Sequence, residues 1–270
     1  MLFKPIPSSF ICFIILLLFQ TACSSPQTKI ETEQQHFNLP AIHHVSDVDS
    51  IRLFECDYLI ESMFLFYGKF KFSDELELQG HPHRIYEYKN EYVREYIKPE
   101  PNDTLQTDGF QIFVDYNTNI TLNGSSETNG NTFFPIYVVN ETTRTKMFVA
   151  KDSYVFGIQE AINDTRYHSW LPIECKPLFF CGNGYYGLMV QPGEFVMFLA
   201  PKYEGEQKYD MRIRLQIGEN LYFSPSYKGT MNPKQFEIKG ADLKYQLNEQ
   251  PANTIQWRFY GAFPLGYEAR

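Results

Sequence analysis

The chain has 270 residues and carries 24 Lys and Arg against 32 Asp and Glu, which gives a formal net charge of −8. An acidic chain without a basic cluster binds nucleic acid and anionic lipid surfaces poorly, so nucleic acid is excluded as a partner. Aromatic residues make up 17% of the chain. In an all-β protein such rings fill the core and pair across strands, whereas in a binding protein they can stack on sugars.

The amino-terminal segment has the pattern of a signal peptide. Lys4 supplies a positive charge, and the apolar run Phe10–Phe19 follows it. This run is shorter than the roughly 20 apolar residues that a spanning helix needs, but it suits a signal-peptide core. The next residues, Thr21-Ala22-Cys23, resemble the lipobox of bacterial lipoproteins, with Gln20 at a position that is usually aliphatic. The resemblance implies cleavage before Cys23, palmitate-type lipid attachment at Cys23, and membrane anchoring in the bacterial cell envelope, at the outer membrane or the periplasmic face.

A polar stretch follows the lipidation site. From Ser24 to Ser50 the chain is dominated by Thr, Gln, Glu and Ser and has no regular apolar period. This composition is typical of a flexible linker. We therefore expect residues 1–22 to be the signal peptide and residues 23–50 to be a tether that lifts a folded body off the membrane.

Residues 51–107 predict a small mixed α/β segment. Apolar residues between Leu53 and Tyr67 recur with roughly helical spacing. In contrast, Ile85–Tyr88 and Tyr92–Ile97 have the pattern of two strands joined by a turn.

From residue 108 to residue 240 the pattern is consistently that of β-strands. In Met211–Ile217 apolar residues alternate with Arg212 and Arg214, which is the period of a strand with one wet face. Short strands separated by turn residues favour a sandwich or a barrel. The predicted strands are Phe110–Tyr116, Phe134–Asn140, Lys146–Val149, Tyr154–Ile158, Tyr185–Val190, Phe195–Leu199, Met211–Ile217 and Leu221–Phe223.

One short motif in this region supports the fold class. Leu188–Val196, with its Pro192-Gly193 turn, resembles the corner between late strands of immunoglobulin-like and fibronectin type III domains, although Phe195 replaces the usual Tyr. The resemblance implies a mainly β fold, an immunoglobulin-like antiparallel β-sandwich over residues 108–240, preceded by the mixed segment. Residues 241–270 are interpreted as a C-terminal extension.

The cysteines suit an oxidising compartment. Once Cys12 leaves with the signal peptide and Cys23 carries lipid, three remain: Cys56, Cys175 and Cys181. Cys175 and Cys181 flank a short segment with a Pro and form the natural disulfide pair. The alternative, in which both are buried thiols, stays open.

The segment from Trp170 to Gly187 is the predicted binding surface because it gathers Trp, Pro, Cys, Gly and Tyr in one irregular stretch. Loops at one end of a sandwich are the usual contact surface of such domains. We expect Trp170, Glu174, Tyr185 and Tyr186 to form this surface, with their aromatic rings exposed to solvent.

Two further groups of residues could carry out catalysis or bind a metal ion. Glycoside hydrolysis needs two carboxylates about 5 to 10 Å apart, and Glu160, Glu174 and Glu194 are the acids in the most apolar context. His81 and His83 can place two imidazoles on one face and bind a metal ion with a third ligand. The alternatives without a chemical role are that Glu174 lies at a strand edge and that the two histidines lie in a solvated turn made by Gly80 and Pro82.

The stretch Gly182–Gly187 matches the Gly-x-Gly-x-x-Gly pattern of dinucleotide sites. That motif works only where a strand leads into a helix whose amino end holds the pyrophosphate. Here a strand pattern follows the glycines, so we reject the motif and expect no cofactor.

Five Asn-x-Ser/Thr triplets occur in the chain. In a bacterial lipoprotein we interpret them as markers of exposed polar loops, not as glycosylation sites. They begin at Asn102, Asn119, Asn123, Asn140 and Asn163.

These features predict a lipid-anchored cell-envelope protein that acts as a non-catalytic binding or scaffolding module. Its partners are expected to be the membrane, through the lipid on Cys23, and a glycan or an envelope protein. The alternatives are a glycan hydrolase that uses a Glu pair, and a metal-binding lipoprotein that uses His81 and His83.

Overall fold

The folded body is built mainly from β-strands. The computed structural model describes residues 36–44, 52–78, 87–88, 91–94, 105–122, 130–162, 169–178 and 183–267, which lie in one compact unit, Gln35–Arg270. The strands are β1 (Ile42–His44), β2 (Ile60–Glu61), β3 (Phe64–Lys71), β4 (Leu76–Leu78), β5 (Tyr92–Arg94), β6 (Gln111–Val114), β7 (Ile120–Thr121), β8 (Thr132–Asn140), β9 (Lys146–Lys151), β10 (Tyr154–Val155), β11 (Gly157–Ile162), β12 (Trp170–Pro172), β13 (Glu174–Cys175), β14 (Tyr185–Val190), β15 (Glu194–Pro201), β16 (Gln207–Ile217), β17 (Asn220–Phe223) and β18 (Tyr227–Met231). A 3-10 turn, η2 (Pro233–Phe236), and the helices α2 (Ala241–Glu249) and α3 (Pro251–Phe259) follow.

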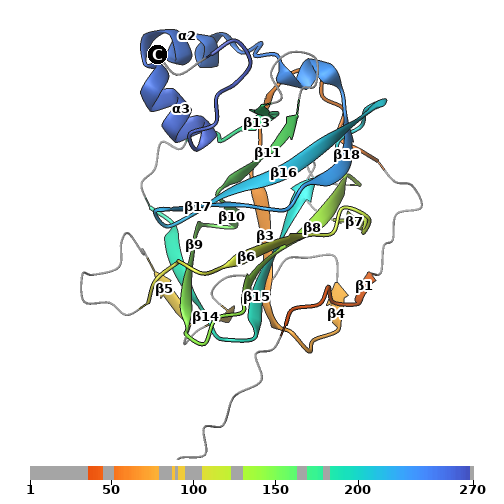
Figure 1. Cartoon of the computed structure of the whole chain (residues 1–270), viewed down its shortest axis with the longest axis vertical. Coiled ribbons are helices and arrows are strands. Elements are labelled where there is room, and N and C mark those ends of the chain that lie inside the picture. The colour runs from red at the N-terminus through yellow and green to blue at the C-terminus, as the bar shows by residue number, and fades with distance from the viewer. Residues whose placement is uncertain are drawn as a thin grey trace, which may run out of the picture. The chain divides into compact units, whose positions relative to one another are not determined.

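Two large antiparallel sheets organise these strands (Figure 1). The nine-stranded sheet has the order β5-β14-β9-β10-β3-β15-β8-β6, with β7 also paired to β8. The five-stranded sheet has the order β12-β11-β16-β17, with β18 also paired to β16. This arrangement confirms a mainly β, antiparallel sandwich. Both sheets hold more strands than those of a constant-type immunoglobulin domain do.

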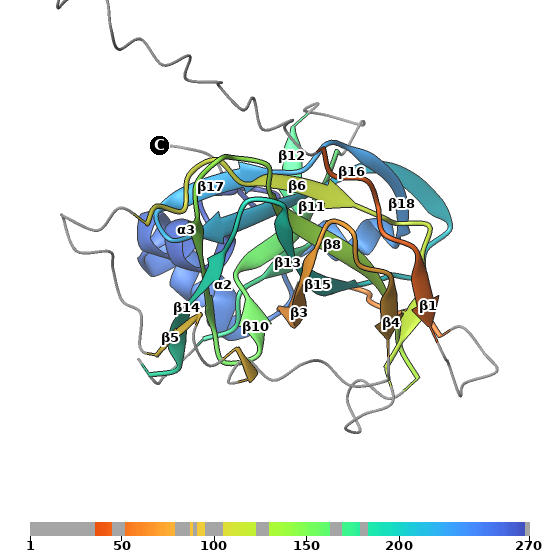
Figure 2. The same ribbon diagram turned by 90° about the horizontal axis from the view of Figure 1, so that it is seen from below.

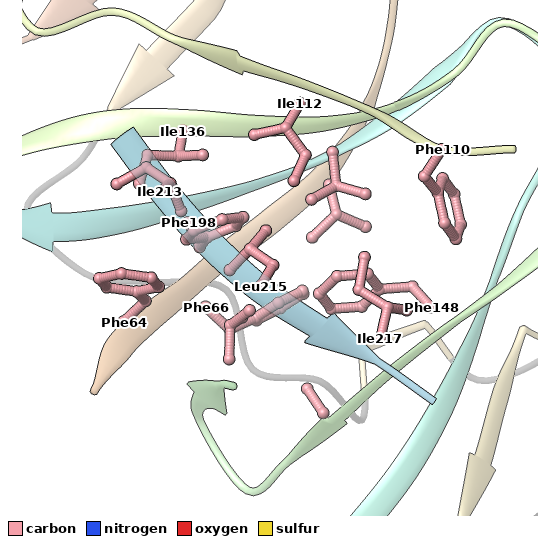
Figure 3. Close-up of a cluster of buried hydrophobic side chains, with 14 of the residues drawn as sticks. Phe64, Phe66, Phe110, Ile112, Ile136, Phe148, Phe198, Ile213, Leu215 and Ile217 are labelled. Carbon is pink, nitrogen blue, oxygen red and sulfur yellow. The ribbon is translucent and has the colours of Figure 1, made fainter. Parts of the chain in front are cut away.

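The main hydrophobic core lies between the two large sheets (Figure 3). β16 contributes Ile213, Leu215 and Ile217, which are fully buried and alternate with half-buried polar residues. From the opposite sheet, Phe64 and Phe198 stack with their ring centroids 5.6 Å apart. The predicted period of two in this strand is therefore confirmed.

The nine-stranded sheet is also covered on its other face. Every residue of β8 and β15 is buried, which requires apolar neighbours on both sides of the sheet. The second cover is a cluster that includes Phe37, Tyr137 and Phe195, together with side chains of β4. β1 and β4 pair in parallel next to each other (Figure 2). Burial on both faces explains why β8 is a continuous apolar run instead of an alternating one.

The C-terminal residues form two helices that pack on the outer side of the five-stranded sheet, where Ile158 contributes to their contact. Leu243 and Leu247 from α2 and Ile255 and Phe259 from α3 are buried in this cluster. The four-residue spacing within each pair places both side chains on one helix face. The predicted C-terminal extension is thus an integral layer of the body (Figure 1).

The predicted tether is too long at its C-terminal end. Phe37 is buried, and its backbone N–H donates to Oε1 of Glu141 at 2.8 Å. Ile42–His44 forms β1. Polar composition concealed these contacts because one aromatic residue and one short strand are enough to attach the segment to a large sheet. The folded body therefore begins by residue 37.

The predicted mixed segment over residues 51–107 is not a separate unit. Phe64–Lys71 is β3, which lies between β10 and β15 inside the nine-stranded sheet. The roughly helical spacing from Leu53 to Tyr67 misled the prediction because β3 is covered on both faces and needs no strict alternation. Of the two predicted strands, Tyr92–Arg94 is β5, and Glu87 and Tyr88 are not in a strand.

We predict that Phe37→Ala destabilises the body by about 3 kcal/mol, because it removes a buried ring. The Phe37 centroid lies 5.0 to 5.5 Å from the centroids of Phe72, Phe113, Tyr137 and Phe195. Urea unfolding measures the loss. Leu39→Ala is the control because Leu39 is 50% exposed. Equal unfolding midpoints for the two variants would show that residues 36–44 do not belong to the body.

Candidate functional site

The four residues predicted to form an exposed binding surface do not form one. Tyr186 and Glu174 are buried, with 1% and 0% of their surfaces exposed. Trp170 is half-buried, and the guanidinium carbon of Arg212 lies 4.4 Å from its ring centroid. Tyr185 lines a pocket that is described below. Period-two alternation turns Tyr185 and Tyr186 to opposite faces of β14, which is why the pair cannot act together.

Glu174 is a buried acid held by hydrogen bonds. Its carboxylate accepts from the backbone N–H of Gln159 at 2.7 Å, from Nε2 of Gln159 at 3.0 Å, and from the hydroxyl of Tyr203. Burial raises the pKa of Glu174 above its ordinary value of 4.5, and these donors offset part of that effect. This carboxyl therefore belongs to a structural network inside the body.

Glu160 is neutralised by two arginines of the neighbouring strand. Arg212 Nε donates to Oε2 at 2.6 Å and Arg214 Nε donates to Oε1 at 2.8 Å, while the glutamate is fully buried. Antiparallel pairing places Glu160 opposite Arg212 and Ile158 opposite Arg214. A buried carboxylate is tolerated only with such partners.

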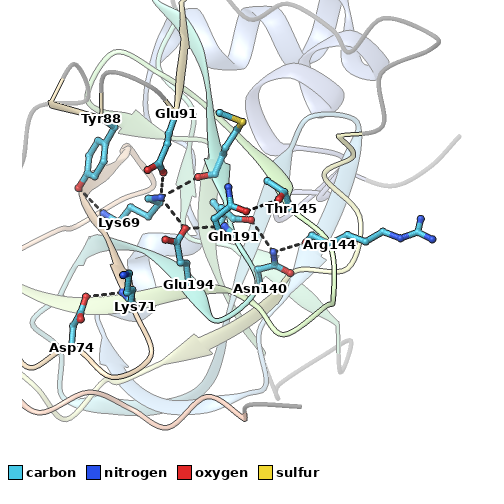
Figure 4. Close-up of polar contacts among 12 residues, drawn as sticks. Lys69, Lys71, Asp74, Tyr88, Glu91, Asn140, Arg144, Thr145, Gln191 and Glu194 are labelled. Atoms are coloured by element: carbon cyan, nitrogen blue, oxygen red, sulfur yellow. Dashed lines mark hydrogen bonds and ion pairs between the residues drawn. The ribbon is translucent and has the colours of Figure 1, made fainter. Parts of the chain in front are cut away.

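Glu194 belongs to a third environment, at the start of β15 (Figure 4). Its Oε2 lies 2.8 Å from Nζ of Lys69 and accepts the N–H of Gln191 at 2.8 Å. Lys69 also pairs with Glu91 and donates to the carbonyl of Met189 at 3.3 Å. The three acids of the hydrolase alternative thus lie in three separate networks. None of them lines the pocket to which Tyr185 belongs.

Cys175 is fully buried and makes no disulfide within the described residues, so the predicted pairing with Cys181 stays a prediction. Its Sγ lies 3.5 Å from Nη2 of Arg258, on α3. Burial raises the pKa of the Cys175 thiol to about 12. Cys181 lies outside the described residues. Cys56 is also a free thiol, half-buried.

The predicted metal ligands His81 and His83 lie outside the described residues. Within the part of the chain that the structure describes, no group of three or more His, Cys, Asp or Glu side chains converges as a metal site. The metal alternative therefore stays a prediction.

The glycine-rich motif has the strand context that the sequence predicts. Tyr185–Val190 forms β14, which pairs antiparallel with β9. Gly184 has a φ of +88°, and a Cβ there would lie 2.1 Å from Oδ1 of Asp152. The positive φ is the conformation that favours a glycine at this position, and a strand follows it instead of a helix.

The Asn-x-Thr triplet at Asn140 is not an exposed loop. Asn140 is fully buried at the end of β8, and its Nδ2 donates to the carbonyls of Arg144 and Val190, both at 2.8 Å (Figure 4). Its amide nitrogen is occupied by the fold and is closed to modification. Asn119 is half-buried, and its Oδ1 accepts from Nζ of Lys202 at 2.7 Å.

A pocket of about 930 Å³ is lined by α3 together with strands and loops of the sandwich. This volume is within the range of roughly 300 to 1,000 Å³ that is typical of small-ligand sites. The lining includes the segment Gln106–Asp108 and residues of the β16–β17 hairpin, from Gln216 to Asn220. It also includes Val149, Phe156, Lys176 and Tyr185, and α3 adds Gln256 and Trp257.

Trp257 is the most accessible aromatic ring of this pocket, with 66% of its surface exposed. Ile255 and Phe259, two positions before and after it on α3, are buried against the sheet. Helix geometry turns the residue between them away from that buried face. A stretch with Pro251 at the first helical turn and this apolar spacing is a usable helix signal, and it could have placed Trp257 on a helix from the sequence, although not in a pocket.

Lys176 lines the pocket next to two of its aromatic rings. Its Nζ lies 4.8 Å from the ring centroid of Phe156 and 5.6 Å from that of Trp257. Burial lowers the pKa of Lys176, and the positive charges of Lys151 and Arg258 lower it further. The acids of the pocket, Asp108 and Glu219, are exposed. The lining therefore combines aromatic faces, amides and charges of both signs.

Comparisons with known proteins found no matching family model, no matching curated protein and no matching solved structure. The fold itself defines the class, a mainly β sandwich with a helical layer on one sheet. Neither helix in the described ranges is long and apolar enough to cross a membrane.

We predict that Glu174 makes the body less stable as the pH rises. A carboxyl whose pKa is raised by folding contributes stability below its unfolded pKa, and this contribution is lost as the pH rises toward the folded pKa. The unfolding free energy of the native chain minus that of Glu174→Gln should therefore fall as the pH rises above the ordinary carboxyl pKa of 4.5, by up to about 1.4 kcal/mol per pH unit.

Denaturant titrations across this pH range measure the difference. Glu204→Gln is the matched control because Glu204 is exposed. The unfolding free energy of the native chain minus that of Glu204→Gln should change little with pH. A Glu174→Gln difference that rises with pH would mean that the hydrogen bonds from Gln159 and Tyr203 outweigh the cost of burial.

Proposed function

We propose that this chain is a lipid-anchored protein of the bacterial cell envelope whose folded body is a non-catalytic binding module. The lipid on Cys23 holds the protein at the membrane, and the pocket beside α3 is its binding site. The observation that carries the binding role is an accessible indole, Trp257, at a pocket of about 930 Å³ that also presents amide groups. Mostly apolar concave sites with a few polar groups are the usual form of small-ligand sites.

The elements that hold the pocket favour binding by a preformed site. Gln216 and Asn220 belong to a β-hairpin whose Gly218 has a φ of +60°, a conformation that suits a glycine at the first position of a two-residue turn. Trp257 is carried by a helix that is buried on its opposite face. A preformed site loses little conformational entropy when a ligand binds.

The enzyme alternative has less support. Glu160 and Glu194 are held by basic side chains and Glu174 by neutral donors, so the carboxylate pair proposed for glycoside hydrolysis has no shared cleft in the described residues. Two other roles for an envelope protein remain as alternatives to ligand binding in this pocket. One is scaffolding, and the other is metal binding through His81 and His83.

We predict that the lipid is attached at Cys23. Cells that express the chain should incorporate labelled palmitate into the native protein, and Cys23→Ser should abolish the labelling because the acceptor thiol is gone. Cys12→Ser is the control and should keep the label, since Cys12 lies in the predicted signal peptide. Labelling that survives Cys23→Ser would contradict the anchor.

We predict that an envelope ligand shields Trp257. The chain has 2 Trp residues, so Trp170→Phe leaves Trp257 as the only indole, and Trp257→Phe leaves Trp170. Acrylamide quenching of fluorescence should be stronger for Trp257, which is exposed, than for Trp170, which Arg212 covers.

A soluble extract of the producing bacterium's envelope should then reduce the quenching of Trp257 and leave that of Trp170 unchanged. Equal protection of both residues, or of neither, would contradict a binding role for the pocket.

A further inference from the structure

We infer that the pocket beside α3 takes a short, uncharged oligosaccharide, with Trp257 as the ring on which one sugar stacks. This inference rests on the proposed binding function and names the chemical class of its ligand. The aromatic surface, the amide groups and the charge of the lining each support it.

The aromatic surface of the pocket is open. Trp257 is 66% exposed, and Nζ of Lys176 lies 5.6 Å from its ring centroid and 4.8 Å from that of Phe156. An ammonium near two aromatic rings is attracted to both by cation–π interaction. The ring of Tyr185 lies 5.7 Å from that of Phe156 and extends the aromatic wall. Flat aromatic faces match the C–H faces of pyranose rings.

The polar lining matches hydroxyl groups. Four amide side chains line the pocket: Gln106, Gln216, Asn220 and Gln256. Each amide both donates and accepts hydrogen bonds, as a sugar hydroxyl does. Two of them are positioned by the protein: Asn220 Nδ2 donates to Oγ1 of Thr107 at 2.8 Å, and Gln216 Nε2 donates to the carbonyl of Gly218 at 3.2 Å. A lining of rings and amides selects ligands with apolar faces and hydroxylated edges.

The charge of the lining favours a neutral ligand. Lys176 disfavours cations, whereas Asp108 and Glu219 disfavour anions. The cations that surround Lys176 already have partners, since Arg258 pairs with Glu61 and Lys151 lies 3.3 Å from Asp152. An anion would gain little from them. Carboxylates such as Asp108 and Glu219 can instead accept hydrogen bonds from sugar hydroxyls.

Size points to more than one sugar unit. The pocket has a volume of about 930 Å³, which is at the upper end of the roughly 300 to 1,000 Å³ range for small-ligand sites. A single pyranose would leave most of it to water. We therefore assign an oligosaccharide that runs from Trp257 toward the β16–β17 hairpin.

The test uses the full-length chain in a detergent without a sugar headgroup, because alkyl glycosides would compete for the pocket. A panel of neutral and acidic oligosaccharides of defined length is screened, and calorimetry gives the Kd of each hit. Trp257→Ala should weaken binding of a neutral oligosaccharide about tenfold or more, as loss of a central Trp does at binding sites. Trp257→Phe should restore part of the affinity.

Tyr245→Ala is the matched control, because Tyr245 is 67% exposed, lies on α2 and is not a lining residue. It should bind like the native chain. Equal Kd values for Trp257→Ala and the native chain, binding of acidic oligosaccharides only, or binding of none of the panel would each overturn the inference. If envelope extract still shields Trp257 in those cases, the binding function stands. Release of reducing ends from a bound oligosaccharide would overturn the non-catalytic function instead.

Discussion

Burial of the nine-stranded sheet on both faces is the constraint on which the other layers depend. β8 and β15 have no exposed residue, so the five-stranded sheet must cover one face and the Phe37 cluster the other. Both faces bury large aromatic side chains, Phe134 and Phe198 on one and Tyr137 and Phe195 on the other. Leaving either face in water would forfeit roughly 25 cal/mol per Å² of apolar surface. The attachment of residues 36–44 to the body follows from this requirement.

The pocket depends on a second interaction, the contact between α3 and the outer face of the five-stranded sheet. Arg214 links the two elements, since its Nε donates to Glu160 and its Nη1 donates to the carbonyl of Tyr260 at 2.8 Å. Tyr260 caps α3 with a left-handed conformation. Glu160, one of the three candidate acids of the hydrolase alternative, therefore helps to anchor the helix that carries Trp257. A buried carboxylate held by two arginines serves structure here because both of its oxygens are occupied.

Local patterns predicted the strands well and the layers poorly. The alternation in Met211–Ile217 and the apolar run at Phe134–Asn140 correspond to β16 and β8 because side-chain period is a property of the strand itself. The spacing of Leu53–Tyr67 failed because a strand covered on both faces has no period to read. Polar composition around Phe37 failed because a single buried ring does not change the average of a segment.

The sequence by itself determined the class of fold, the positions of most of the longer strands after residue 108 and the lipobox-like pattern at Cys23, because each of these depends on short-range spacing. It missed β12 and β13, which lie in the stretch predicted to be irregular, and it missed β18. Only the tertiary structure decided which acids are occupied and which aromatic ring is open. Tyr186 is buried because it packs in the core between the two large sheets, and Glu174 is buried where Gln159 and Tyr203 bind its carboxyl. Trp257 is exposed because its helix buries the opposite face. Burial and pairing are set by residues far apart in the chain, so no local pattern could assign the pocket.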